Sequence, residues 1–365
     1  MSYLNRAVAA AASLLFAVIA SMSLANAADL PAKAVKKVAA SDLPFFFIID
    51  DRVTYSWMPR GTDPGHFSAN PNGTFNGNTA KSVYSFTHFD AWAYGTNFFT
   101  ISMFKSDHND PAMPCVNAGV LLSGAAATCA GATEFYGLVR STIGFNEVFN
   151  TKAFSMGPLR NVSFEIGADA GTLNTFLGPS KRDIVAGLQF AFDLPYNGFF
   201  NVAPLYYKEI GHNAFSQCGL FGAGVVGVTC LPDGNTEFKG TWAVETNYSM
   251  NLGFLPESMQ FFAISGRAAW YGKKGNQTSP LGVAGGGTDT AIEFNSEPIR
   301  LTFDASKAIW GPKYSHNVDV WVAYRYWQNK FGLDHNAAPG VCTVAGVSTN
   351  TCTESTVYSG VTVKF

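Results

Sequence analysis

The stretch NVSFEIGAD, residues 161–169, alternates between apolar and polar or small side chains without a break. Every second side chain in it is apolar: Val162, Phe164, Ile166 and Ala168. Successive side chains of a β-strand point to opposite faces, so this period of two predicts a strand with one apolar wall and one polar wall.

The same alternation recurs along the chain and predicts twelve strands. It is clearest in residues 183–193, 236–249 and 318–326. The fold class is therefore all-β, and an even number of strands allows the first and last strands to meet in a closed antiparallel sheet. The predicted strands span roughly 48–58, 81–91, 97–105, 133–143, 161–170, 183–193, 198–209, 236–249, 259–271, 293–304, 318–329 and 353–365.

The composition favours a membrane barrel over a soluble domain. Charged residues make up 14% of the chain, against about 25% in average soluble domains. The apolar residues are abundant but never contiguous for the roughly 20 positions of a membrane-spanning helix. Dispersed apolar content of this kind is typical of alternating strands that face lipid, which makes outer-membrane lipid an expected partner. A net charge of −2 argues against nucleic acid as a partner.

The lengths of the connections separate a barrel from a soluble sandwich, which would also alternate. Short links such as AYGT and LPYN follow even-numbered strands, although those after the fourth and tenth strands are longer. The longest links follow odd-numbered strands: 59–80, 106–132, 210–235, 272–292 and 330–352. In an up-and-down barrel all odd links lie at one end. We therefore predict a closed transmembrane barrel over residues 48–365 with long extracellular loops.

The start of the chain predicts export. Arg6 precedes an apolar run over residues 7–20, and Ala25-Asn26-Ala27 fits a cleavage site. The run is shorter than the roughly 20 residues that an uncleaved anchor would need. Residues 1–27 are thus predicted to be a signal peptide and residues 28–47 a periplasmic N-terminal arm. With a barrel after them, the predicted location is the bacterial outer membrane.

The last segment, VYSGVTVKF over residues 357–365, alternates up to Phe365. A terminal aromatic residue on an alternating strand resembles the insertion signal of bacterial outer-membrane barrels. That resemblance implies the barrel assembly machinery as a partner, through the strand that ends at Phe365.

The six cysteines fall into three local pairs and show no C-x₂-C spacing of a zinc site. Six cysteines allow fifteen connectivities. Local pairing is preferred because each pair lies inside one predicted odd link, and an exported protein meets an oxidising compartment. The predicted disulfides, which would brace the extracellular loops, join Cys115 with Cys129, Cys218 with Cys230, and Cys342 with Cys352.

The candidate functional site is the lumen of the barrel. Twelve strands enclose more space than the eight that side chains just fill, and less than the sixteen to eighteen of water-filled porins. The residues predicted to line the channel are His88, Asp90, Tyr136, Arg140, Glu165, Asp169, Lys239, Glu245, Arg267, Arg300, Asp319, Trp321 and Arg325. Asp50, Arg52, Glu134, Asp304, Tyr207 and Trp327 are assigned inward as well.

Such a lining suits passive uptake of small polar solutes. Rings can stack on a flat solute, while carboxylates and guanidinium groups bond to its hydroxyls. Weak contacts of this kind let a solute enter and leave. The alternative is that the interior charges pair with one another and fill the lumen. The protein would then be a structural or adhesive barrel whose loops bind a partner.

Catalysis is not predicted. Only His88 among the histidines lies on a predicted strand; Ser85 is on the opposite face and Ser82 is about 20 Å along it at ~3.3 Å per residue. A lumen- or rim-sited hydrolase would need a serine from a neighbouring strand. The SDHND loop, residues 106–110, lacks the spacing of an EF-hand. No metal or cofactor is therefore expected.

The hairpin HFDAWAYGTNFFTISMF, residues 88–104, resembles the early hairpin of the Tsx-like family of nucleoside-specific channel-forming outer-membrane proteins. The shared features are a Trp-x-Tyr-Gly turn at Trp92, Tyr94 and Gly95, followed by Asn-Phe-Phe. Residues 134–145 and 183–207 are similar to later strands of that family. The resemblance implies a twelve-stranded channel and, less directly, nucleosides, because residues 96 and 100–102 lack the acidic side chains of the family pattern.

Overall fold

The computed structural model describes residues 45–69, 72–111, 120–121, 130–175, 179–212, 218, 224–274, 291–336 and 341–365. The chain divides into two units, residues 1–44 and Phe45–Phe365, and only the second is described below. The predicted signal peptide and residues 28–44 of the predicted arm therefore lie outside the described residues. The first strand begins at Phe46, just before the predicted end of the arm.

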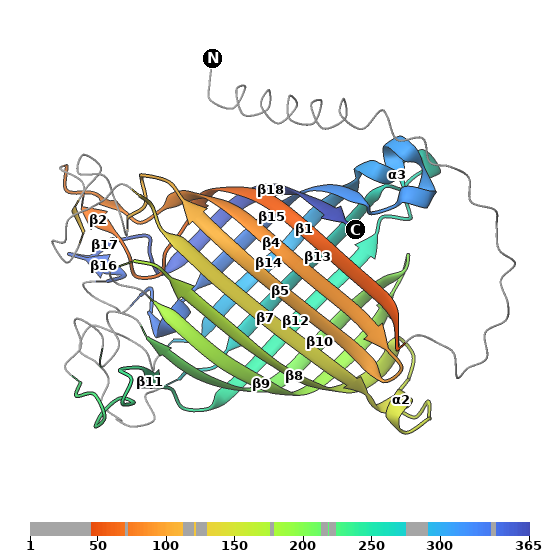
Figure 1. Cartoon of the computed structure of the whole chain (residues 1–365), viewed down its shortest axis with the longest axis horizontal. Coiled ribbons are helices and arrows are strands. Elements are labelled where there is room, and N and C mark those ends of the chain that lie inside the picture. The colour runs from red at the N-terminus through yellow and green to blue at the C-terminus, as the bar shows by residue number, and fades with distance from the viewer. Residues whose placement is uncertain are drawn as a thin grey trace, which may run out of the picture. The chain divides into compact units, whose positions relative to one another are not determined.

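A thirteen-stranded antiparallel sheet forms the barrel, and twelve of its strands close into a ring while β11 only extends β10. The first and last strands of the ring, β1 and β18, pair from Arg52↔Lys364 to Trp57↔Ser359 (Figure 1). The predicted fold class, a closed twelve-stranded barrel, is confirmed. In ring order the strands are β1 (Phe46–Gly61), β4 (Thr79–Trp92), β5 (Gly95–Ser106), β7 (Thr133–Gly144), β8 (Leu159–Leu173), β9 (Ser180–Leu194), β10 (Gly198–His212), β12 (Thr241–Asn251), β13 (Phe262–Tyr271), β14 (Glu293–Asp304), β15 (Val318–Gln328) and β18 (Thr353–Lys364).

Short elements occupy the connections between these strands. None of the helices in the described part of the chain is long and apolar enough to cross a membrane. The two longer even links contain α2 and the pair α3 and η3, which explains their length. The short elements are β2 (Ser68–Ala69), β3 (Phe75–Asn76), β6 (Val120–Leu121), β11 (Thr236–Glu237), β16 (Thr343–Val344), β17 (Val347–Ser348), α2 (Phe145–Val148), α3 (Ala305–Trp310), η2 (Glu257–Met259), η3 (Pro312–Tyr314) and η4 (Lys330–Gly332).

The two ends of the barrel differ as the link lengths predicted. The tight β4–β5 turn and the helices α2 and α3 lie at one end, and β2, β11, β16 and β17 lie at the other (Figure 1). Gly95 is needed at the turn, because a Cβ there would lie 1.8 Å from the carbonyl oxygen of Thr142. Short turns mark the periplasmic end of outer-membrane barrels and long loops the extracellular end.

Two of the three predicted disulfides are confirmed. Cys218 bonds to Cys230, with Cα atoms 6.2 Å apart, and Cys342 bonds to Cys352, with Cα atoms 5.5 Å apart. Both lie in connections at the extracellular end. Cys115 and Cys129 lie outside the described residues, so their pairing stays a prediction.

The outer wall of the barrel is predominantly apolar. Closing the sheet leaves no unpaired backbone edge, which is the condition for spanning lipid with strands. Exposed outward side chains on successive strands include Val53, Ile101, Val139, Ile166, Ile184, Ile299, Val322 and Val357. Exposed aromatic residues such as Trp57, Tyr84, Trp242 and Trp270 accompany them, as in the aromatic girdles of membrane barrels.

Candidate functional site: the barrel lumen

The inner wall of the barrel can be traced from side chains that meet inside it. Trp321 on β15 is 3% exposed, and its Nε1–H donates to Oγ1 of Thr362 on β18 at 3.0 Å. Thr362 in turn lies 2.8 Å, oxygen to oxygen, from Thr54 on β1. Because side chains alternate along each strand and the register is known, these contacts assign inner and outer faces all around the ring.

Arg140 on β7 forms the first bridge across the lumen. Its Nε and Nη2 donate to the carboxylate of Glu245 on β12 at 2.9 and 2.8 Å. Nη1 donates to Asp169, which also accepts a bond from the Tyr136 hydroxyl at 2.7 Å. The Glu165 carboxylate lies 3.9 Å from Nε. Three strands separate β7 from β12 in the ring, so this guanidinium group spans a chord of the lumen.

A second bridge reaches from β15 towards β5. Arg325 on β15 pairs with Glu354 at 2.9 Å, and its guanidinium carbon lies 5.4 Å from the centre of the Phe104 ring on β5. The strands β18, β1 and β4 lie between β15 and β5. The two bridges together narrow the free cross-section of the barrel.

Near the second bridge, a stacked arginine faces the lumen. Nε of Arg300 donates to Glu297 at 2.7 Å, and the guanidinium carbon lies 3.9 Å from the centre of the Trp321 ring. The Tyr358 hydroxyl also donates to Glu297, while its ring meets Trp321 edge-on at 5.1 Å. An arginine over an indole face is a cation–π contact and can offer a flat platform to a solute.

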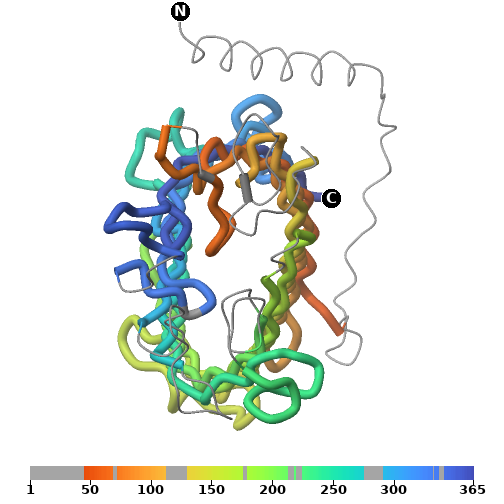
Figure 2. Tube along the Cα trace, turned by 90° about the vertical axis from the view of Figure 1, so that its left-hand side faces the viewer, coloured from red at the N-terminus to blue at the C-terminus, as the bar shows by residue number. Residues whose placement is uncertain are grey.

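The extracellular mouth is partly covered by the connection that follows β1. Figure 2 looks onto this end and shows the chain after β1 bending in over the opening. Asp63 in this connection is 0% exposed and pairs with Lys81, and the Thr62 amide donates to Glu354 at 2.7 Å. The segment is thus held inside the barrel by bonds to its wall.

Two carboxyl groups at this mouth have opposite pKa shifts. Burial is the largest single influence on Asp63 and would raise its pKa, but the Lys81 ammonium, the hydrogen bond with Asp110 and the neighbouring His66 together hold that pKa below its usual range. Burial, and then the neighbouring Asp63 carboxylate, raise the pKa of Asp110 to about 8. Asp110 is therefore protonated at neutral pH, which limits repulsion between the two acids.

A third group of charges lies in the same half of the lumen. Lys274, in the connection after β13, reaches Glu209 on β10 at 2.5 Å and Glu293 on β14 at 2.8 Å. Its ammonium lies 5.4 Å from the centre of the Tyr207 ring. All of these side chains are almost completely buried. Paired charges and rings therefore occupy part of the extracellular half of the lumen and narrow it.

The periplasmic half of the lumen is more accessible to water than the extracellular half. The side chain of Arg52 on β1 is 33% exposed and that of Arg300 on β14 is 28% exposed, although both point inward. Arg267 on β13 also points inward and is exposed. Arg52 pairs with Asp50 and lies 3.6 Å from Asp319. Water thus reaches an arginine-rich vestibule that opens towards the short-turn end.

Most of the predicted lining residues point inward in the structure. The periplasmic vestibule and the two bridges account for them, and Asp50, Arg52, Glu134, Asp304, Tyr207 and Trp327 also belong to the inner wall. The inward residues of the predicted lining are Tyr136, Arg140, Glu165, Asp169, Glu245, Arg267, Arg300, Asp319, Trp321 and Arg325.

Three predicted lining residues are placed elsewhere. His88 and Asp90 lie on the outer wall. They are on the same face of β4 as the exposed Tyr84, and His88 pairs with the outward Asp51 of β1. Their polarity had suggested the lumen, whereas Ser85 and Thr87 occupy the inner face. Lys239 is exposed in the connection between β11 and β12, because the predicted strand 236–249 is interrupted there.

His88 does not have the geometry of a catalytic base. Its Nδ1 lies 2.7 Å from Asp51 and its Nε2 lies 3.1 Å from Asp90, so a carboxylate occupies each ring nitrogen. A general base for a serine needs one of these nitrogens within reach of the hydroxyl. The arrangement therefore gives no support to a hydrolase built on His88.

Sequence reasoning missed several interior charges. Lys274 comes from a long connection, for which no alternation exists. Glu297 has the parity opposite to Arg300, yet both point inward because the β14–β15 register shifts between Ser296 and Ile299. Pro298 inside the strand was the available signal, since proline in a strand often marks a bulge.

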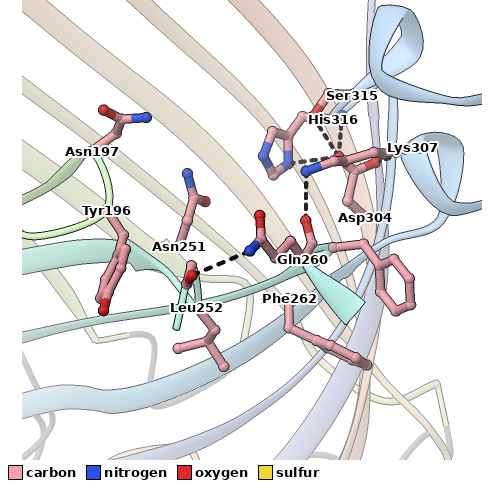
Figure 3. Close-up of a pocket in the computed structure, with 12 residues that line it drawn as sticks. Tyr196, Asn197, Asn251, Leu252, Gln260, Phe262, Asp304, Lys307, Ser315 and His316 are labelled. Carbon is pink, nitrogen blue, oxygen red and sulfur yellow. Dashed lines mark hydrogen bonds and ion pairs between the residues drawn. The ribbon is translucent and has the colours of Figure 1, made fainter. Parts of the chain in front are cut away.

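A cavity of about 310 Å³ lies at the periplasmic end, between the turns after β9, β12 and β14 (Figure 3). Asp304 and His316 line it, and together with Asp319 they place ligand atoms within 4.8 Å of one another. The Asp304 carboxylate, however, already accepts bonds from Ser306, the Lys307 amide, Ser315 and the His316 amide at 2.6–2.9 Å. These bonds fasten α3 and the turn before β15, so a cation would have to displace them.

Comparison with known proteins found no matching family model and no matching curated protein. Three solved structures illustrate what the fold is similar to. The translocator domain of the autotransporter NalP from Neisseria meningitidis is 9% identical, with a TM-score of 0.37 over 87% of this chain and 88% of that chain. The P. putida toluene transporter TodX is 8% identical, with a TM-score of 0.32 over 87% and 89%. Pseudomonas aeruginosa OpdQ is 8% identical, with a TM-score of 0.28 over 87% and 96%.

The class of the protein follows from its own closed sheet, apolar outer wall and polar interior. It is a twelve-stranded β-barrel of the bacterial outer membrane. The short turns face the periplasm and the disulfide-braced connections face outward.

Proposed function

We propose that the barrel is a passive channel for small polar solutes. The observation that carries the proposal is the wet arginine vestibule, in which Arg52, Arg267 and Arg300 point into the lumen and remain exposed to water. Buried charges in a mere structural core are paired and dry. Exposed guanidinium groups inside a membrane barrel indicate an aqueous route, which the paired charges nearer the extracellular mouth narrow.

The chemistry of the vestibule favours solutes with a flat face and several hydroxyls. The Arg300 guanidinium, which lies over the buried Trp321 ring and is 28% exposed, can stack on a ring of the solute. The Asp50 carboxylate, whose side chain is 16% exposed, can accept bonds from hydroxyl groups. Nucleosides have this character, and the Tsx-like hairpin at residues 88–104 also suggests them. Nucleoside selectivity would depend on the Arg300–Trp321 platform and not on His88 and Asp90, which face outward.

The second candidate is a structural or adhesive barrel whose lumen stays closed. The observation that favours it is the dry Lys274–Glu209–Glu293 group, which occupies part of the extracellular half together with Asp63 and Lys81. In that case, the extracellular loops would carry the function by binding a partner. Insertion by the barrel assembly machinery, through the strand ending at Phe365, stays a prediction under either candidate.

Conductance in planar bilayers tests the proposal. A channel should give discrete conductance steps, and added nucleoside should reduce the current in a concentration-dependent way. Trp321→Ala should abolish this block while the open-state current persists, and Trp242→Ala, which changes an outward tryptophan, should leave the block unchanged. Folded barrels, recognised by a heat-dependent shift on SDS gels, that show no conductance at any voltage would support the closed barrel instead.

A further inference from the structure

The outer wall of the barrel carries a row of polar side chains across β1, β4, β5 and β7. These strands lie side by side (Figure 1). The row, called the outer polar row below, consists of Asp51, His88, Asp90, Asn97 and Ser141, all on outward faces.

Hydrogen bonds join the members of the outer polar row from end to end. His88 bonds to Asp51 at 2.7 Å and to Asp90 at 3.1 Å. Nδ2 of Asn97 donates to Oδ1 of Asp90 at 2.8 Å, and the Ser141 hydroxyl donates to Oδ1 of Asn97 at 2.7 Å. The row is therefore a continuous network with its carboxylates at one end and its amide and hydroxyl at the other.

The position of the row is unusual for a lipid-facing wall. Exposed apolar side chains, among them Val53, Ile101 and Val139, lie on its extracellular side. The aromatic pair Trp92 and Tyr94 lies on its periplasmic side. Trp92 lies two positions beyond Asp90, roughly 7 Å along the strand at ~3.3 Å per residue, so the row lies on the inner side of the aromatic girdle. Ionisable groups facing lipid are unfavourable and rare, and those present mark a contact.

A phospholipid headgroup is a poor match for this row. Such a headgroup carries a phosphate, which needs a cation or several N–H donors. In the described parts of β1, β4, β5 and β7, no Lys or Arg points outward beside the row. The outward Lys105 lies at the opposite end of β5, where it bonds to carbonyl oxygens of the loop. A protein surface that offers both donors and acceptors fits the row better.

A second copy of the chain offers such a surface. Two barrels in one membrane have the same orientation, so a two-fold axis between them must lie along the membrane normal. The axis reverses the lateral order of the strands. When it passes between β4 and β5, β4 of one copy faces β5 of the other. The amide of Asn97 uses one N–H for its own Asp90, and a primary amide has a second.

We propose that the wall formed by β1, β4, β5 and β7 is the interface of a two-fold dimer. In it, the second N–H of Asn97 in each copy donates to the Asp90 carboxylate of the other copy. The contact is formed twice because of the symmetry, and both bonds involve a charged acceptor, which makes them stronger than neutral ones. Asp90 is only 5% exposed within one copy, so the groups that the dimer removes from lipid are mainly Asp51 and His88, whose side chains are 28% and 31% exposed.

The first test is the oligomeric state in detergent with added phospholipid, measured by light scattering after gel filtration. The wild-type barrel should be a dimer. Asn97→Asp keeps the size of the side chain but removes both N–H donors and places a carboxylate against Asp90, so the dissociation constant should rise at least tenfold. Thr246→Val, which changes an outward polar residue on the distant β12, should have no effect.

Cross-linking provides a test that does not depend on the stability of Asn97→Asp. Phe99 lies outward beside His88 near the proposed axis, so Phe99→Cys should form a disulfide-linked dimer in the membrane. Trp242→Cys, on the opposite side of the ring, should not. Each variant is first checked for the heat-dependent gel shift of a folded barrel. Any one of three results would overturn the proposal. They are a monomeric wild-type barrel, with or without bound phospholipid; a different protein cross-linked at position 99; and equal self-cross-linking of the Phe99→Cys and Trp242→Cys variants.

Discussion

Replacing Arg140 by alanine should open the lumen and make it more selective for cations. The guanidinium group bridges β7 to Glu245 on β12 and neutralises part of a group of three carboxylates. Counted formally, three carboxylates and one guanidinium carry a charge of −2, and the variant carries −3. The same change removes the longest side chain from the chord between the two strands.

The size of the effect follows from Coulomb's law. One additional negative charge about 6 Å from a passing ion changes the energy of that ion by about 0.7 kcal/mol in a water-like medium and by about 2.8 kcal/mol at an effective dielectric constant of 20. A cation gains this energy and an anion loses it. The ratio of potassium to chloride permeability should therefore rise at least about tenfold, since about 1.4 kcal/mol corresponds to a factor of ten.

The assay is the reversal potential and the single-channel conductance in a salt gradient across a planar bilayer. Arg140→Ala should also lower the stability of the barrel by about 3–5 kcal/mol, because it leaves buried carboxylates without their partner. Urea unfolding followed by the heat-dependent gel shift measures that cost. Arg160→Ala removes an exposed arginine at the start of β8 and should change none of these quantities.

A double variant separates width from charge. Arg140→Gln combined with Glu245→Gln breaks the bridge but keeps two carboxylates, Glu165 and Asp169, so the formal charge of the group stays at −2. Conductance should rise while ion selectivity stays near that of the wild type. If Arg140→Ala conducts like the wild type and has the same reversal potential, the bridge does not lie on the ion path and the reasoning is wrong.

Three further outcomes are expected. Replacing both Cys342 and Cys352 by serine should make their loop cleavable by added protease, with a loss of about 2–4 kcal/mol of loop stability, while the gel shift of the barrel persists. Trp321→Ala should destabilise the barrel by about 3–5 kcal/mol in urea, because it removes a buried ring and its stack with Arg300. Asp110 has a pKa raised to about 8, mainly by burial, so the folded mouth holds a proton that an opened mouth releases between about pH 4 and pH 8. The equilibrium constant for closing the mouth should therefore fall as pH rises through this range, by up to about tenfold per pH unit. Hydrogen exchange of residues 62–69, compared between the wild type and Asp110→Asn at matched pH, measures the difference.

The strands were predictable because a membrane barrel imposes the same two-walled pattern on each of them. The predicted strand 293–304 coincides with β14, and residues 133–143 differ from β7 by one position. The main failure was the segment 236–249, which the structure divides into β11 and β12. Gly240 lies at this break against the Tyr206 ring, where a Cβ would come within 2.1 Å of the hydroxyl oxygen.

The direction in which a polar side chain points was less predictable than the strand that carries it. Alternation defines two faces but does not say which one meets lipid, and polarity was used to choose. That choice fails on β4, where His88 and Asp90 share the outward face with Tyr84 and Phe86. The two aromatic residues of the same parity were the better guide, because rings are frequent on the lipid-facing wall.

The partners of the inward charges could not be predicted at all, and the function depends on them. Arg140 and Glu245 are 105 residues apart, and only the closed ring brings them together. A charge that reaches across a chord narrows the channel, whereas a charge paired along its own wall leaves it open. Arg52, which bonds to Asp50 two residues away, belongs to the second kind and lies in the wet vestibule. The width of the passage is therefore decided by side-chain reach across the ring, a property that strand alternation does not contain.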